Sequence, residues 1–124
     1  MGDINGLHDR YKDKVEFLLV YIREAHPTDG RQVPANQREN VLYAEPKSDQ
    51  ERHEVAGLCI RKLDIRMPAL IDNLKNTTEA AYAGWPDRLY LVDRQGRIAY
   101  KGQPGPAGFR PAELDAAIGK LLSQ

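Results

Sequence analysis

The amino-acid sequence predicts an α/β fold, and three observations indicate it. Residues 17–22 are continuously apolar, as expected of a parallel strand that is covered on both faces. Residues 88–101 have the pattern of two short strands joined by a turn. Residues 114–122 repeat apolar side chains at helical spacing. Strands and helices therefore alternate along the chain, which is typical of an α/β domain.

The size and charge of the chain limit its class. Its 124 residues fit one domain, 1–124, that can bury a core without disulfides. The 18 basic and 18 acidic residues balance and are scattered, so we expect neither nucleic acid nor a membrane as a partner. No apolar run approaches the roughly 20 residues that span a bilayer, and no export signal is visible. We therefore expect a cytoplasmic protein, and the single cysteine, Cys59, which excludes an intrachain disulfide, fits a reducing compartment.

The N-terminal half has the elements of a βα unit. Leu7 and Tyr11 lie one helical turn apart among charged residues and predict a short helix over 7–14. The apolar strand follows at 15–22. A loop rich in proline, glycine and asparagine covers 27–47, and long ordered loops in compact domains are often functional.

A second helix begins at a capping box. Ser48 can accept a hydrogen bond from the amide three residues on, while Glu51 reaches back. The predicted apolar face of this helix comprises Val55, Leu58, Cys59 and Leu63. We therefore place Cys59 in the core, where a free cysteine behaves as a small hydrophobe. A strand at 69–72 and a short helix at 76–83 are expected next.

The C-terminal half predicts a hairpin and a helix. Strands at 88–93 and 97–101 flank a turn, and a stiff loop at 102–106 leads to a final helix at 111–122. A parallel βα half followed by a ββα half is the order of the thioredoxin fold. The extra helix and strand at 48–72 indicate its peroxiredoxin-like variant, a three-layer α/β/α sandwich.

Three segments carry a resemblance to a known family. Residues 20–30 resemble the pattern VYIEEAHxSDGW, residues 86–92 resemble PERLYVI, and residues 96–114 resemble GRILYKGxxGPxxYxPEEV. These are patterns of the iodothyronine deiodinases, and the chain is most similar to their bacterial deiodinase-like branch. The match extends over most of 15–122, with a divergent stretch at 31–66.

The resemblance implies a thiol or selenol redox protein that carries out reductive dehalogenation or thiol–disulfide or peroxide chemistry. By position it implies that His26 and Glu24 are catalytic, with His26 moving protons and Glu24 as its acidic neighbour. Arg88 matches the arginine of the PERLY segment. Pro86 takes the place of the cis-proline that faces the nucleophile in thioredoxin-like folds, and Trp85 precedes it. We assign Arg88, Pro86 and Trp85 to substrate binding.

The family carries its reactive selenocysteine or cysteine upstream of Met1. We therefore expect an N-terminally truncated fold that lacks the nucleophile and is inactive by itself. Loss of the central strand would expose two sheet edges, at 17–22 and 89–92. We expect the strands at 15–22 and 88–93 to close against each other within the chain, and the alternative is a homodimer in which a second chain fills the gap. The alternative is a non-catalytic thioredoxin-like binding or interaction module. A cysteine or selenocysteine codon upstream of Met1 would favour the redox enzyme.

From the residues alone, each candidate also has a structural interpretation. Histidine as a residue type suits proton transfer near neutral pH, so His26 is a candidate general acid or substrate clamp, or it is a loop histidine bonded to backbone. Glu24 orients it or is solvated. Arg88 holds an anionic group of a small-molecule or thiol/disulfide substrate, or pairs with a nearby carboxylate. His8 and His53 lack metal-ligand spacing, so we expect no metal and no cofactor.

Overall fold

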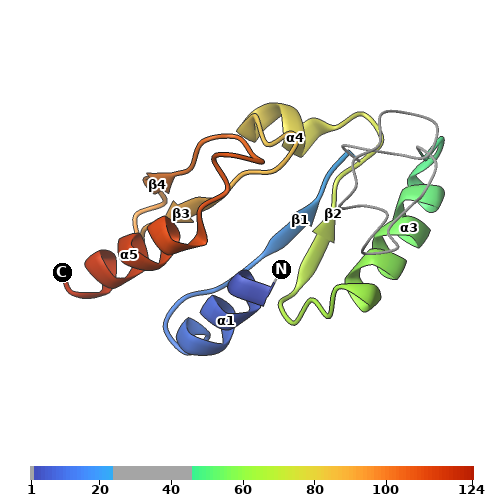
Figure 1. Ribbon diagram of the computed structural model, residues 1–124. Coiled ribbons are helices and arrows are strands. Elements are labelled where there is room, and N and C mark those ends of the chain that lie inside the picture. Colours follow the sequence, from blue (N-terminus) through green and yellow to red (C-terminus); the bar gives the residue numbers. More distant parts are fainter. Residues whose placement is uncertain (1, 24–45) are drawn as a thin grey trace. The chain divides into compact units, whose positions relative to one another are not determined.

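The computed structural model describes residues 2–23 and 46–124 (Figure 1). These residues contain helices and short strands in mixed order, so the coarse α/β expectation is confirmed. The chain divides into two compact units, Met1–Tyr82 and Ala83–Gln124. The single domain and the three-layer thioredoxin-like arrangement concern both units together and stay predictions. Among the described residues, no helix is long and apolar enough to cross a membrane.

The first unit contains a small parallel sheet and its helices. Its elements are α1 (Gly2–Tyr11), β1 (Leu19–Tyr21), α3 (Asp49–Lys62), β2 (Ala69–Ile71) and α4 (Thr77–Tyr82). Strands β1 and β2 pair in parallel, with Val20 opposite Leu70, and α3 runs beside β2 (Figure 1). Each of these strands is three residues long, which is shorter than the strands predicted at 15–22 and 69–72.

The capping box of α3 is confirmed, with one difference. The Glu51 amide donates to Ser48 Oγ at 3.1 Å, as expected. The carboxylate of Glu51 accepts the amide of Lys47 at 2.6 Å instead of the amide of Ser48. Both contacts give a hydrogen-bond acceptor to a backbone amide at the start of α3. The negative charge of Glu51 is also favourable at this end of the helix.

The buried face of α3 differs from the prediction. Arg52 and Ala56, one helical turn apart, are its fully buried residues, whereas Leu58 is 39% exposed. Cys59 is only partly buried, with Sγ 4.0 Å from the hydroxyl of Tyr21. The core position expected for Cys59 is therefore wrong. Arg52, for which the sequence predicts no buried position, instead enters the interior of the unit.

Hydrogen bonds explain how a charged residue is buried there. Arg52 Nη1 donates to the carbonyl of Asn73 at 2.6 Å and to Asn76 Oδ1 at 2.9 Å. These contacts hold α3 against the turn between β2 and α4. A buried guanidinium needs hydrogen-bond partners, and the turn supplies two acceptors for Nη1, whereas the buried Nε has no partner among the described residues.

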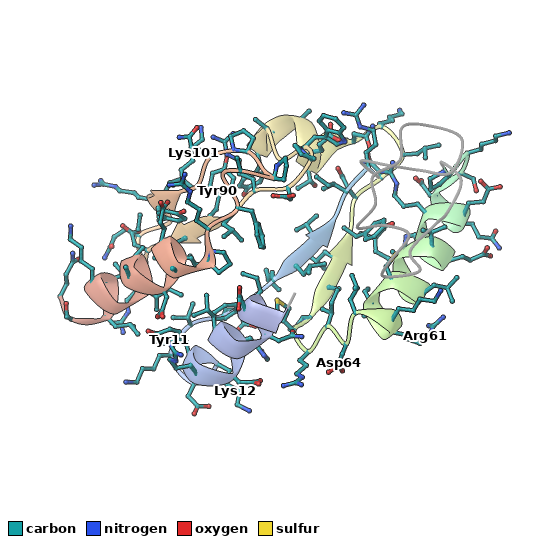
Figure 2. All side chains as sticks on the ribbon, viewed as in Figure 1. Tyr11, Lys12, Arg61, Asp64, Tyr90 and Lys101 are labelled. Carbon is teal, nitrogen blue, oxygen red and sulfur yellow. The ribbon has the colours of Figure 1, made fainter. Side chains whose placement is uncertain are left out.

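The first helix begins earlier than the sequence predicts, at Gly2, and ends at Tyr11, which Figure 2 labels. Ile4 and Leu7 are its buried apolar residues. Asn5 is also buried and donates from Nδ2 to the carbonyl of Asp64 at 2.7 Å. The helix is thereby attached to the loop that joins α3 to β2.

The second unit is a hairpin with one helix. Strands β3 (Tyr90–Val92) and β4 (Ile98–Lys101) are antiparallel, as predicted. Asp93 Oδ1 accepts the amides of Gln95 and Arg97, each at 2.9 Å, and closes the turn. Gly96 adopts a φ of 81°, a region that glycine reaches without steric cost.

Helix α5 (Pro111–Leu122) packs on both strands of this hairpin. Its side of the interface contains Leu114 and Ile118, which are buried as the apolar stripe predicts. Leu122, the last residue of the stripe, is 38% exposed. On the hairpin side Leu91 is buried, so the core of this unit lies between β3 and α5.

Candidate functional site

The predicted site residues fall into two groups. Trp85, Pro86 and Arg88 lie in the second unit, within the five residues that precede β3. His26 and Glu24 lie outside the described residues, and their proximity to Arg88 stays a prediction. The structure therefore places only the substrate-binding candidates.

The peptide bond between Trp85 and Pro86 is cis, the form that the sequence predicts. The bond between Gly105 and Pro106 is also cis, which the sequence did not indicate. Trp85 is 42% exposed, so part of its indole surface is open to solvent.

Arg88 is held by three groups of the second unit. Its Nε donates to the carbonyl of Gly102 at 2.7 Å, and its Nη1 donates to the carbonyl of Ala83 at 3.2 Å. Its Cζ lies 5.8 Å from the centre of the Tyr90 ring. We call these three contacts the Arg88 clasp. Tyr90 is labelled in Figure 2, beside Lys101, its partner across the hairpin.

The clasp restrains the cation without neutralising it. Within residues 2–23 and 46–124, no carboxylate forms an ion pair with Arg88. The alternative interpretation, in which Arg88 pairs with a nearby carboxylate, is therefore not supported in this part of the chain. In the same part of the chain Nη2 has no hydrogen-bond partner. An anionic group can therefore bind at the terminal edge of the guanidinium, where charge-assisted bonds are strong.

Gly102 allows the loop to approach Arg88 closely. Its amide donates to the carbonyl of Leu89 at 2.9 Å, while its own carbonyl accepts from Arg88. A Cβ at this position would lie 3.3 Å from the carbonyl of Leu89 and 3.2 Å from the hydroxyl of Tyr100. A side chain at this position would therefore press on the Leu89 carbonyl and the Tyr100 side chain, which would have to shift by a few tenths of an ångström.

Asp87 is a titratable group next to the clasp that sequence reasoning missed. Its Oδ1 is buried and has no hydrogen-bond partner among the described residues. Burial raises the pKa of this carboxyl above its usual range. The backbone carbonyl of Asp87 accepts the amide of Gly105 at 2.9 Å, which fixes the loop beside it.

The described residues contain no cluster of three histidine, cysteine or acidic side chains that could hold a metal ion. His8 instead packs edge-on against Phe17, with the ring centres 5.5 Å apart. The absence of a metal and of a cofactor stays a prediction.

Comparison with known proteins decides the family. The family model described as iodothyronine deiodinase matches residues 1–122. The chain belongs to the iodothyronine deiodinase family. This result confirms the resemblance that the three sequence segments carry.

Individual deiodinases show the same relationship. The chain is 31% identical over 120 residues to the type I iodothyronine deiodinase of Xenopus laevis, covering 97% of this chain and 45% of that protein. It is 36% identical over 107 residues to the thyroxine 5-deiodinase of Sparus aurata, covering 85% of this chain and 38% of that protein. The chain thus spans less than half the length of these relatives. Both are vertebrate proteins, so membership of a bacterial branch stays a prediction.

Proposed function

We propose that this chain is the thioredoxin-like domain of a redox enzyme that reductively removes halogen from an aromatic substrate. The relatives named above act, by their names, on iodothyronines and on thyroxine. In such a reaction a carbon–iodine bond is replaced by a carbon–hydrogen bond, iodide leaves, and a thiol or selenol is oxidised. We propose that the thiol or selenol nucleophile lies outside these 124 residues. We also propose a cytoplasmic location.

The Arg88 clasp is the observation that supports a role in substrate binding. Its open terminal edge would receive the carboxylate of an iodothyronine. The exposed face of Trp85 would contact an aromatic ring of the same substrate, because indole surfaces stack on other rings. His26, oriented by Glu24, would supply the proton that replaces the halogen, and Pro86 would shape the substrate groove.

Binding of thyroxine tests the role of Arg88. Trp85 is the only tryptophan, so its fluorescence reports ligand binding beside the site. The wild-type chain should bind thyroxine, and Arg88→Gln should weaken binding about tenfold or more, because a charge-assisted hydrogen bond contributes about 1.5–3 kcal/mol. Removing the carboxylate from the ligand should weaken binding to the wild type and abolish its dependence on Arg88.

Arg110→Gln is the matched control, since Arg110 is an exposed arginine of the same unit that pairs with Glu113. It should leave the affinity for thyroxine unchanged. Equal affinity of wild type and Arg88→Gln for thyroxine would contradict the proposed site. Tight binding without iodide release, in a longer chain that carries the family nucleophile, would favour the binding module over the enzyme.

A homodimer through a sheet edge is a separate part of the proposal. In the described residues each sheet has two strands, β1 with β2 and β3 with β4. A second chain could add its strand to an outer edge through backbone hydrogen bonds. Sedimentation equilibrium should then show a dimer, and proline at Val20 in β1 or at Ala99 in β4 would identify the edge that is used.

A further inference from the structure

The ring of Tyr90 supports Arg88 because of their spacing in the chain. Residues two apart in an extended segment project their side chains to the same side. Tyr90 is the first residue of β3 and Arg88 lies two residues before it, and the guanidinium carbon lies 5.8 Å from the ring centre. A cation over the face of an aromatic ring is attracted by the quadrupole of that ring.

The contacts of the clasp also decide which edge of Arg88 a ligand can use. A carboxylate can approach a guanidinium side-on, through Nε and Nη2, or end-on, through Nη1 and Nη2. The carbonyl of Gly102 occupies Nε at 2.7 Å, which removes the side-on approach. Nη1 carries a second N–H beside the one that donates to the carbonyl of Ala83, and Nη2 has no hydrogen-bond partner among the described residues. The end-on approach therefore remains while the side chain stays in this position.

We propose that Tyr90 is a positioning residue, whose ring holds Arg88 so that its terminal edge meets the anionic group of the substrate end-on. This inference rests on the proposed function of Arg88. An arginine side chain has several rotatable bonds, and a ligand that must first order them binds more weakly. The ring and the two carbonyls order Arg88 before the ligand arrives. The contact with Arg88 is made by the ring of Tyr90, so phenylalanine should preserve it.

A pair of matched probes tests the role of Tyr90. The carboxylate probe is 3-(4-hydroxyphenyl)propanoate and the neutral probe is its primary amide, both followed by Trp85 fluorescence. We expect Tyr90→Leu to weaken binding of the carboxylate about two- to fivefold, the range of a cation–π contact, and to leave the amide unchanged. We expect Tyr90→Phe to bind both probes as the wild type does.

A double-mutant cycle separates positioning from a merely structural role. In the Arg88→Gln background Tyr90→Leu should have no further effect on the carboxylate, because no cation remains to be positioned. Loss of affinity for both probes in Tyr90→Leu, or an equal loss with and without Arg88, would overturn the inference. If Arg88→Gln alone leaves carboxylate binding unchanged, the proposed function of Arg88 fails instead.

Two further variants control the experiment. Lys101→Gln removes an exposed positive charge opposite Tyr90 on the same hairpin, and carboxylate affinity should be unchanged. Tyr90→Ile keeps a residue with high strand propensity and should reproduce the result of Tyr90→Leu if the leucine variant does not fold. Circular dichroism and the thermal midpoint establish that each variant is folded. Full carboxylate affinity in a folded Tyr90→Ile would also overturn the inference.

Discussion

The carboxylate of Asp72 accepts the backbone amide of Glu79 at 2.9 Å, across the turn that joins β2 to α4. The amides of Asn73 and Thr78 donate to the same carboxylate at 2.9 and 3.0 Å. Asp72 is 5% exposed. Burial alone raises the pKa of this carboxyl, but the three backbone hydrogen bonds outweigh burial and hold the pKa below 3.8. Asp72 therefore caps the start of α4 as an anion.

Asp72→Ala should lower the free energy of unfolding by about 1–3 kcal/mol at pH 7. The substitution leaves the amides at the start of α4 without their acceptor. Urea denaturation at pH 7 measures the change. Asp13→Ala is the control, because Asp13 is exposed and outside the helices, and it should change the free energy of unfolding by less than about 0.5 kcal/mol.

The contribution of Asp72 should also depend on pH. Its pKa is lower in the folded chain than in the unfolded chain, so its stabilisation is complete above the unfolded value near 3.8. It is lost as the pH falls through the folded pKa. The difference in unfolding free energy between the wild type and Asp72→Asn should therefore be constant from pH 7 to pH 5 and shrink below pH 3.8. A difference that stayed constant down to pH 2.5 would refute this assignment.

The sequence predicts the elements that depend on local chemistry. The capping bond from Glu51 to Ser48 and the Asp93 turn involve residues within four positions of one another, so their patterns are readable. The predicted ends of the strands are less accurate, because the apolar sequence extends beyond the residues that pair with a neighbouring strand. Arg52 was assigned to no buried face, since its acceptors lie more than 20 residues away in the turn at 73–76.

The candidate site was predicted in part for the same reason. Family resemblance indicated Arg88, and the spacing of two residues in an extended segment could have indicated Tyr90. Nothing local indicates the carbonyl of Gly102, because its contact with Arg88 spans 14 residues. Asp87 was missed because its burial depends on the loop around Gly105. The catalytic roles of His26 and Glu24 lie outside the described residues and stay predictions.

Asn5→Ala should lower the free energy of unfolding by about 1–3 kcal/mol. Asn5 Nδ2 donates to the carbonyl of Asp64 at 2.7 Å, and its Oδ1 accepts the amide of Arg66 at 3.3 Å, so alanine would leave two backbone groups unpaired. Urea denaturation measures the loss. Asp9→Asn is the control, since Asp9 contacts Arg66 only through an exposed ion pair of the kind that contributes little. An equal effect of the two substitutions would show that attachment of α1 does not depend on Asn5.

The 124-residue chain should show no thiol–disulfide turnover. Exchange with turnover needs a second thiol or an accessible thiol with a low pKa, and the single cysteine, Cys59, is partly buried beside the hydroxyl of Tyr21. Reduction of insulin by dithiothreitol should proceed at the same rate with and without the chain. Acceleration that disappears in Cys59→Ser would show that this thiol is reactive after all.

Asp87 and Gly105 should be energetically coupled. A Cβ added to Gly105 would overlap the carboxyl group of Asp87, so Gly105→Ala should lower the free energy of unfolding by about 1–3 kcal/mol. Asp87→Ala removes the overlapping atoms and should restore most of that loss when the two substitutions are combined. Asp87→Asn has the same shape as aspartate and should not restore it. Urea denaturation of the four chains in each cycle gives the coupling free energy.

The charge of Asp87 can be separated from its shape in the same experiment. Because burial raises the pKa of this carboxyl, the folded chain binds its proton more tightly than the unfolded chain does. Any stability from this group is present below the unfolded pKa of about 3.8 and is lost as the pH rises through the folded pKa. At pH 7 Asp87→Asn should therefore be slightly more stable than the wild type, and at pH 3 the advantage should vanish. If Gly105→Ala and Asp87→Ala were instead additive at pH 7, the carboxyl of Asp87 would not occupy the space beside Gly105.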